Sequence, residues 1–123
     1  KESDVRALIE QGLNGLLLDL LDPSSVESAV DIVLNQTGGT LDALFNNGAY
    51  GLAGAVEDLT RDTLRIQFET NVFGWLQLTN LIIPVMRKQG HGRIIQNSSI
   101  LGVITMPYRG AYNASKFAIE EIG

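Results

Sequence analysis

Two side chains near the carboxyl end, Tyr112 and Lys116, have the types and the spacing that acid–base chemistry requires. In a helix, residues four apart share one face, with Cβ atoms about 5–6 Å apart. A tyrosine phenol keeps its proton up to about pH 10, and a nearby cation eases its release by stabilising the phenolate. The pair could therefore exchange a proton near neutral pH. Alternatively, it could belong to an ordinary solvated helix face.

Ser99 carries a hydroxyl group at the end of a short strand that is expected to begin at Ile94 and Ile95. It lies thirteen residues before Tyr112. One loop between them could return the helix so that the phenol faces the serine. Ser99 could then hydrogen-bond a substrate carbonyl oxygen while Tyr112 protonates it. Capping or loop hydrogen bonding is the alternative role for such a serine.

Asn71 lies inside a long helix expected from Thr60 to about Lys88. Asparagine is mildly unfavourable there, and in so apolar a stretch its amide needs a partner. It could hold a water or a backbone group in a polar network, or make a purely structural hydrogen bond.

Two further groups follow expected strands. Residues 46–49 (NNGA) come directly after the strand expected at Leu41–Phe45. Gly48 and Ala49 are small enough for a planar ligand to approach the backbone, although a simple turn would use the same residues. Asp19 could accept hydrogen bonds from an exocyclic amine, or it could be a solvated strand end.

The elements that must position these residues alternate between helices and short apolar strands, which predicts an α/β architecture with parallel strands. The strands are expected at Gly15–Leu20, at Leu41–Phe45 and from Ile94. Ligands of such sheets bind outside the carboxyl ends of the strands. All three polar strand ends should therefore point into one crevice.

Composition narrows the class of protein. Hydrophobic residues make up 45 % of the 123 residues and charged residues 19 %, which fits a folded core and excludes disorder. No apolar run approaches the roughly 20 residues of a membrane helix, so no membrane partner is expected. With no cysteine and no cluster of metal ligands, neither a metal site nor a disulfide is expected, and the location should be cytoplasmic. The net charge of −5 argues against nucleic acid as a partner.

Residues 112–116 (YNASK) are similar to the Tyr-x-x-x-Lys motif of short-chain dehydrogenases/reductases, in its common Tyr-x-Ala-Ser-Lys form. Residues 46–49 resemble the Asn-Asn-Ala-Gly turn of that family, with the last two small residues exchanged. Ser99 and Asn71 match its catalytic serine and asparagine, and Asp19 resembles the acidic residue that contacts the adenine. Because these signals occur in the right order over nearly the whole chain, the resemblance is specific.

The resemblance implies a Rossmann-type, doubly wound parallel sheet in three α/β/α layers, and hydride transfer between NAD(P) and a carbonyl or secondary alcohol. Tyr112 would be the acid/base, and Lys116 would favour its phenolate and bind the nicotinamide ribose. Ser99 would orient the substrate oxygen, and Asn71 would anchor a proton-relay water. The implied cofactor-binding residues are Asp19, Leu20, Asn47, Gly48, Ala49, Tyr112 and Lys116, and the implied substrate contacts are Ser99, Met106 and Tyr112.

Two parts of the family pattern are not in the sequence. One is the glycine-rich Thr-Gly-x-x-x-Gly-x-Gly turn that seats the pyrophosphate, and the other is everything beyond the catalytic helix. By family topology, the first two strands would lie between Gly15–Leu20 and Leu41–Phe45, so we expect those two segments not to pair. We expect residues 1–123 to be a single NAD(P)-binding domain, incomplete at both ends, that neither folds nor works alone.

The resemblance also bears on partners. NADP(H) is slightly favoured over NAD(H), because Lys1 would lie just beyond the second strand, where basic residues of the family meet the ribose 2′-phosphate. The long helix from Thr60 and the helix from Gly110 form subunit contacts in many relatives, which implies a homodimer or homotetramer. The apolar loop 101–109 would touch the substrate, a lipid-like or aromatic carbonyl.

Two other classes of function remain open from the sequence. One is a cofactor-binding regulator or sensor with the same fold and no turnover. The complete set of Asn71, Ser99, Tyr112 and Lys116 argues against it, because binding alone has no need of Ser99. The other is a structural or interaction module in which these residues occur together by chance.

Overall fold

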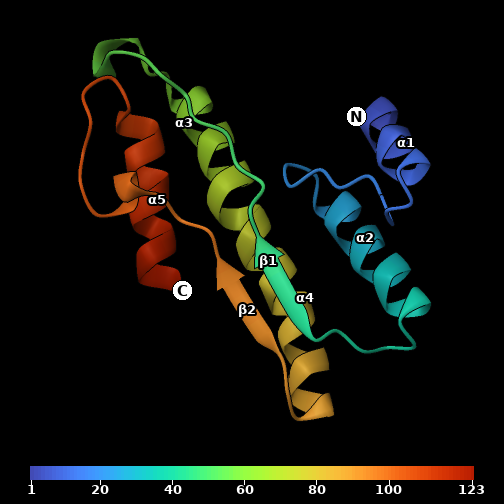
Figure 1. The fold of residues 1–123 in the computed structure, drawn as a ribbon. Helices are drawn as coiled ribbons and strands as arrows, with labels where there is room; N and C mark the ends of the chain where they lie inside the picture. The colour runs from blue at the N-terminus through green and yellow to red at the C-terminus, as the bar shows by residue number, and fades with distance from the viewer.

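The computed structural model describes residues 1–123 as five α-helices and a two-stranded parallel sheet. A π-helical turn at Glu69–Phe73 joins the third helix to the fourth, and 3₁₀ turns lie at Val56–Asp58 and Ile100–Gly102. Figure 1 shows α3 and α4 as one long rod behind the strands, with α5 on one side and α1 and α2 on the other. The elements are α1 (Glu2–Glu10), α2 (Pro23–Gln36), β1 (Ala43–Asn46), α3 (Arg61–Phe68), α4 (Gly74–Gln89), β2 (Arg93–Gln96) and α5 (Gly110–Ile122).

The helices begin and end at local sequence signals. Asp22 caps α2 by accepting a hydrogen bond from the Ser24 N–H at 3.0 Å, and the hydroxyl and N–H of Ser24 together hold the pKa of this carboxyl below its usual value. Thr60 caps α3 by accepting from Thr63 N at 3.1 Å. Gly90 ends α4 with a left-handed φ of 81°. None of the helices combines the length with the hydrophobicity that crossing a bilayer requires.

The sheet brings two of the predicted strand ends together. β1 and β2 are parallel, with Ala43 opposite Arg93 and Asn46 opposite Gln96. Just beyond the ladder, Asn97 N donates to Asn46 O at 2.9 Å, and the Asn97 amide donates to Asn47 Oδ1. The carboxyl ends of both strands therefore meet at one edge, as the sequence predicts.

The strand predicted at Gly15–Leu20 does not form. These residues run as chain without a ladder partner, and Leu17 and Leu18 are exposed. A strand needs a neighbouring edge to satisfy its N–H and C=O groups, and β1 pairs only with β2. The prediction of a third strand is therefore wrong for this structure, whereas the expectation that this segment does not pair with the next strand is confirmed. That next strand, predicted at Leu41–Phe45, spans Ala43–Asn46.

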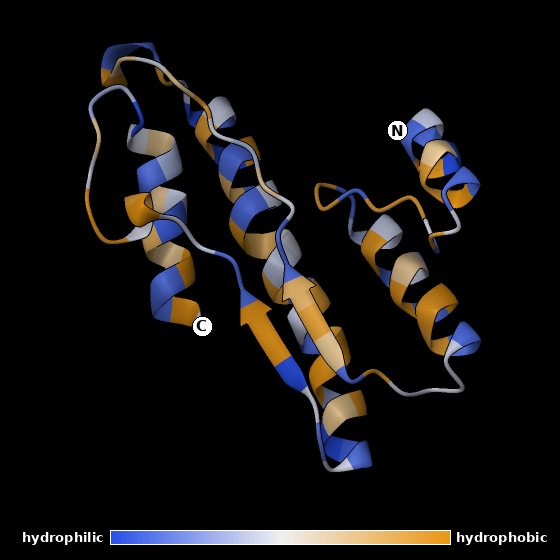
Figure 2. Ribbon diagram, in the orientation of Figure 1, coloured by the Kyte–Doolittle hydropathy of each residue, from blue (hydrophilic) through white to orange (hydrophobic).

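One face of the sheet is covered and the other is bare. Leu44 and Ile94, opposite each other in the ladder, pack on the cluster formed by α2 and α4. Their neighbours Phe45 and Ile95 are exposed, although the middle of each strand is hydrophobic in Figure 2. Beside β1, a groove of about 370 Å³ with mainly hydrophobic walls extends to residues 14–18. The further strands predicted between these segments would occupy this groove.

Two small clusters form the core. Val30 of α2 packs with Ile82 and Met86 of α4. Val72 and Trp75 pack with Ile119, which joins the long rod to α5. Because α4 takes part in both clusters, it sets the position of α5 relative to the sheet.

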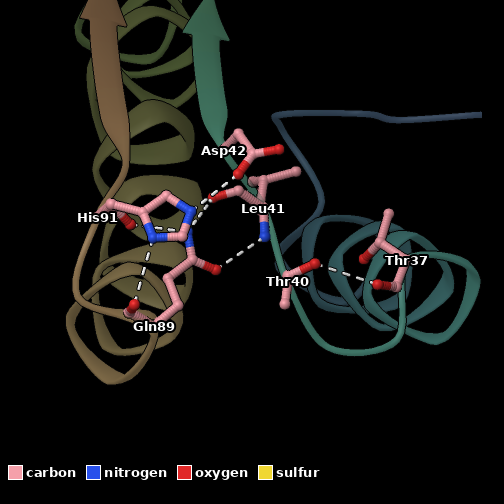
Figure 3. Close-up of polar contacts among 6 residues, drawn as sticks. All are labelled: Thr37, Thr40, Leu41, Asp42, Gln89 and His91. Carbon is pink, nitrogen blue, oxygen red and sulfur yellow. Dashed lines mark hydrogen bonds and ion pairs between the residues drawn. The ribbon is translucent and has the colours of Figure 1, made fainter.

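The amino ends of the strands are fastened to the end of α4 (Figure 3). The Gln89 side chain accepts from Leu41 N at 3.1 Å and donates to Leu41 O at 2.8 Å and to His91 O at 2.7 Å. His91 Nε2 lies 3.0 Å from Asp42 Oδ1. These contacts hold the start of β1 beside the turn that leads into β2. They lie at the opposite end of the sheet from the carboxyl ends of the strands.

Candidate active site

A cleft of about 320 Å³ lies where the chain leaving β1 meets the start of α5. The Tyr112 ring forms part of its wall, and a Cβ atom on Gly51 would lie only 3.4 Å from Tyr112 Cδ2. The phenol thus borders an open space, as an acid–base group must. Met106, predicted to contact substrate, belongs to the same wall. The lining residues are Ala49, Tyr50, Gly51, Leu101, Met106, Arg109 and Tyr112.

Lys116, one turn after Tyr112, is only 2 % exposed. Its Nζ donates to Asn97 O at 2.9 Å and lies 4.5 Å from the centroid of the Trp75 ring and 5.8 Å from that of Tyr112. Burial lowers the pKa of Lys116, and the charge of Glu120 partly raises it again. No carboxylate lies within 4.0 Å, so a carbonyl oxygen and two aromatic rings stabilise the ammonium instead.

Asn71 is completely buried, and all its amide contacts are within the chain. Its Oδ1 accepts from Tyr50 N at 3.1 Å, and its Nδ2 donates to Tyr50 O at 2.9 Å and to Ser115 Oγ at 3.1 Å. Ser115 in turn donates to Tyr112 O at 2.8 Å. The side chain thereby ties the chain leaving β1 to α5, which is the backbone-holding role that the sequence left open.

The π-helical turn aligns Asn71 with two other buried polar side chains, Gln67 and Trp75. All three donate hydrogen bonds to the segment 48–52. On an ideal α-helix, a step of four residues drifts by about 40° around the axis. The extra residue of a π-turn offsets this drift, so the three side chains stay on the face that meets the chain leaving β1.

The predicted cofactor-binding tip, residues 47–49, is exposed at the end of β1. Trp75 Nε1 donates to Gly48 O at 2.6 Å, which holds the tip on α4. A Cβ atom on Gly48 would lie 3.1 Å from Leu20 Cδ1, so Leu20 is its direct neighbour. Gly48 has no side chain and Ala49 has only a methyl group, so the backbone here is accessible. This fits a planar ligand that lies along it.

Asp19 makes no hydrogen bond to the other predicted site residues. Its exposed carboxylate accepts from Leu21 N at 3.0 Å, and its own N–H donates to Ser25 Oγ at 2.9 Å. The next residue, Leu20, is in backbone contact with α4, because a Cβ atom on Gly74 would clash with Leu20 O. The structure therefore joins Leu20 to the site, whereas Asp19 is bonded only within its own turn.

The two hydroxyls after β2 have different surroundings. Ser99 Oγ accepts from Leu101 N at 3.2 Å and so caps the 3₁₀ turn. Ser98 Oγ is buried without a hydrogen-bond partner, and a Cβ atom on Gly102 would lie 2.6 Å from it. No hydrogen bond joins Ser99 to Tyr112; they are linked through Leu101, which contacts the serine and lines the cleft.

Three residues of this arrangement do not appear among the sequence-based predictions as site residues: Gln67, Trp75 and Ser115. A sequence pattern could have identified Gln67 as a site residue, because it is a polar residue four positions before Asn71 on an apolar helix face. Trp75 lies in the same long helix among apolar residues, and no sequence pattern indicates that its indole N–H bonds a loop carbonyl. Ser115 lies inside the motif, but its link to Asn71 joins residues 44 apart in the chain.

Comparison with known proteins bears on the family of this chain. The family model described as short chain dehydrogenase matches residues 3–122. The oxidoreductase YbbO of Escherichia coli (strain K12) is 42 % identical over 120 residues, which cover 98 % of this chain and 45 % of YbbO. The 3-ketodihydrosphingosine reductase of Bacteroides thetaiotaomicron is 41 % identical over 105 residues, which cover 85 % of this chain and 39 % of the reductase. The chain thus spans less than half the length of these curated relatives.

Solved structures show the same fold. A short-chain dehydrogenase from Streptomyces avermitilis superposes with a TM-score of 0.87 at 32 % identity, over 98 % of this chain and 44 % of that chain. A short-chain dehydrogenase/reductase from Burkholderia phymatum, in complex with NAD, gives a TM-score of 0.87 at 27 % identity, with the same coverage of 98 % and 44 %. The two strands and their helices are therefore part of a Rossmann-type α/β fold. The chain belongs to the short-chain dehydrogenase family.

Proposed function

We propose that this chain carries the catalytic centre of an NAD(P)-dependent oxidoreductase that acts on a carbonyl or secondary alcohol. The observation that carries the proposal is the pairing of an almost fully buried ammonium, on Lys116, with the Tyr112 phenol at an open cleft. Burying a charge is costly, and no carboxylate lies within 4.0 Å of the ammonium to offset that cost. The names of the relatives, an oxidoreductase and a reductase, support the same reaction class.

In carbonyl reduction, a dinucleotide held at this site would supply the hydride that the carbonyl carbon receives. Tyr112 donates its phenolic proton to the carbonyl oxygen, so that hydride and proton together give the alcohol. Lys116 stabilises the phenolate that remains. Ser99 Oγ accepts from Leu101 N, which leaves its O–H free to donate a hydrogen bond to the same substrate oxygen. Asn71 would anchor the water that returns a proton to Tyr112 through its main chain, because both hydrogens of its side-chain amide are already donated within the chain.

The dinucleotide would lie along the carboxyl ends of the strands. Asp19 would accept a hydrogen bond from the adenine amine, Leu20 and residues 47–49 would line its path, and Lys116 would bind the nicotinamide ribose. The accessible backbone at Gly48 supports this placement. NADP(H) is slightly favoured over NAD(H) on the ground of Lys1, an exposed basic residue before α1.

The proposal extends to assembly and location. Leu76 of α4 and Phe117 of α5 are exposed apolar residues, which supports a homodimer or homotetramer formed through these helices. Size-exclusion chromatography with light scattering would test this for the full-length protein. A cytoplasmic location is proposed from the absence of cysteine.

The full-length protein should oxidise NADPH or NADH in the presence of carbonyl compounds, followed by the loss of nicotinamide absorbance. Tyr112→Phe should lower kcat by at least about a hundredfold, because the proton donor is lost. Lys116→Met should lower it as well, whereas Lys88→Met, which removes an exposed lysine of α4, should not. Dinucleotide binding, measured by fluorescence, should survive in Tyr112→Phe.

Two results would contradict the proposal. If Tyr112→Phe retains full activity, the acid–base assignment is wrong. If the wild-type protein binds NAD(P)H but reduces no member of a broad panel of carbonyls, it is a regulator or sensor with the same fold.

A further inference from the structure

A guanidinium group, that of Arg109, stands in the wall of the cleft beside Tyr112. Arg109 Nη1 would lie 3.6 Å from a Cβ atom on Gly51, and Tyr112 Cδ2 would lie 3.4 Å from the same point. The cation and the phenol ring therefore face one small space. Because Gly51 has no side chain, nothing fills that space.

Arg109 has no charged partner in the chain. None of the three ion pairs includes it, and its side chain makes no hydrogen bond. The chain has 14 acidic residues against 9 basic ones, yet no acidic residue lines the cleft. A guanidinium presents five donors in a planar fork that matches the oxygens of a carboxylate or a phosphate. The cleft thus holds an unused anion-binding group inside an acidic molecule.

The loop that carries Arg109 is held in place by contacts on both sides. Asn113 Nδ2 donates to Met106 O at 3.0 Å, and Asn113 N donates to Arg109 O at 2.7 Å. Tyr108 adopts a φ of 60°, which bulky residues rarely do, and its carbonyl accepts from Gly54 N at 2.9 Å. These contacts fix the backbone from which the Arg109 side chain extends into the wall of the cleft. The stability of α5 does not explain an arginine at position 109, because the positive end of the helix dipole disfavours a cation just before the helix.

The rest of the wall is apolar. Leu101 and Met106 lie on the side of the loop, and Ala49 lies on the side of β1. A ligand that satisfies both parts of the cleft needs an apolar body and an anionic end. A volume of about 320 Å³ is enough for a compact group of this kind.

We propose that the cleft takes carbonyl substrates that carry a carboxylate or phosphate group, which Arg109 binds while the apolar body lies against Leu101 and Met106. This inference rests on the proposed function, because Tyr112 must act on the carbonyl. It makes Arg109 a specificity-determining residue. It also narrows the lipid-like or aromatic class expected from the sequence to its anionic members.

The test uses the full-length protein and matched pairs of aldehydes. One pair is 4-carboxybenzaldehyde and its methyl ester, and the other is 4-formylphenyl phosphate and 4-methoxybenzaldehyde. In each pair, kcat/KM for the anionic member should exceed that for the neutral member by at least about tenfold, the effect of one charge-assisted contact. The pair with the larger ratio identifies the carboxylate or the phosphate as the preferred group.

Variants then assign the preference to Arg109. In Arg109→Met, the ratio should fall to about one, and in Arg109→Glu it should invert. Arg87→Met is the matched control, because it removes the same charge from an exposed residue in the last turn of α4, at the far end of the rod in Figure 1. The ratio in Arg87→Met should equal that of the wild type. Since both members of a pair are measured in the same protein, a loss of folded enzyme does not change the ratio.

The two proposals fail in different ways. If the wild-type protein reduces no carbonyl at all, the proposed function is wrong and this inference falls with it. If it reduces neutral and anionic members equally well, or if Arg109→Met keeps the anionic preference, the oxidoreductase assignment stands and the role of Arg109 is wrong.

Discussion

Lys116 combines a positive charge with almost complete burial, and this determines how the site responds to pH. Loss of hydration lowers its pKa below the ordinary value, and Glu120 offsets part of that change. Because the folded-state pKa lies below that of the unfolded chain, the unfolded state binds more protons between the two values. The free energy of unfolding therefore rises with pH across that window. Activity that needs the charged form of Lys116 should decline at a lower pH than an exposed lysine would allow.

Glu120→Gln tests this electrostatic balance in the full-length enzyme. Without the neighbouring negative charge, the pKa of Lys116 should fall further, and the alkaline limb of the kcat/KM–pH profile should move to lower pH. Glu121→Gln removes the same charge from the next exposed residue of α5, and no effect of Glu121 on Lys116 is found. An equal shift in both variants, or a shift of the limb to higher pH in Glu120→Gln, would refute the assignment.

At the scale of elements, the rod formed by α3, the π-turn and α4 positions the cleft wall opposite α5. Three of its side chains, Gln67, Asn71 and Trp75, hold the irregular chain that leaves β1. That chain has few partners in regular structure, so buried side-chain amides replace the ladder bonds that a strand would make. The rod thereby gives a loop the fixed geometry that a substrate-binding wall needs.

Gln67→Leu should destabilise this wall. Gln67 is fully buried, donates to Tyr50 O at 2.8 Å and accepts from Leu52 N at 2.8 Å. Tyr50 O keeps Asn71 as a donor, whereas the Leu52 N–H loses its side-chain partner, at a cost of about 1–3 kcal/mol. Urea unfolding of the full-length protein would measure this loss.

The control for this prediction is Gln36→Leu, the same change at an exposed position at the end of α2. Its free energy of unfolding should stay within about 0.5 kcal/mol of the wild-type value. If the two variants lose equal stability, the buried amide of Gln67 does not hold the wall.

At the scale of the whole molecule, little of the chain is shielded from water. Only 18 of 123 residues are buried, and one face of the two-stranded sheet carries exposed Phe45 and Ile95. Sheets of two strands rarely support a stable fold, because they bury too little apolar surface. The hydrophobic groove beside β1 adds to the exposed apolar area.

We therefore expect the 123-residue chain, expressed alone, to unfold without cooperativity and to bind hydrophobic dyes. The fluorescence of Trp75, the only tryptophan, and far-ultraviolet circular dichroism should give broad urea transitions with different midpoints. The full-length protein should show a steep transition in the same buffer. A sharp, coincident transition of a sample whose intact mass matches 123 residues would overturn this prediction.

Features that depend on neighbours in the sequence could be predicted from the sequence. Tyr112 and Lys116 share a helix face because of helical periodicity, and Asp22 and Thr60 cap their helices through residues two or three positions away. The apolar run at Leu41–Phe45 and the one that begins at Ile94 predicted the two strands that form, at Ala43–Asn46 and Arg93–Gln96. The family could be identified because its motifs are local patterns in a set order.

Features that depend on residues distant in the chain were decided only by the tertiary structure. Residues 15–20 have the composition of a strand, but a groove of about 370 Å³ separates them from the free edge of β1, so they have no ladder partner. The burial of Lys116 depends on Trp75 and Asn97, and the alignment of Gln67 with Asn71 depends on a π-turn that no local pattern indicates. Side-chain types and helix faces follow from local sequence. Burial, pairing and the shape of the cleft follow from contacts between segments, because each of them needs a partner that the local sequence does not contain.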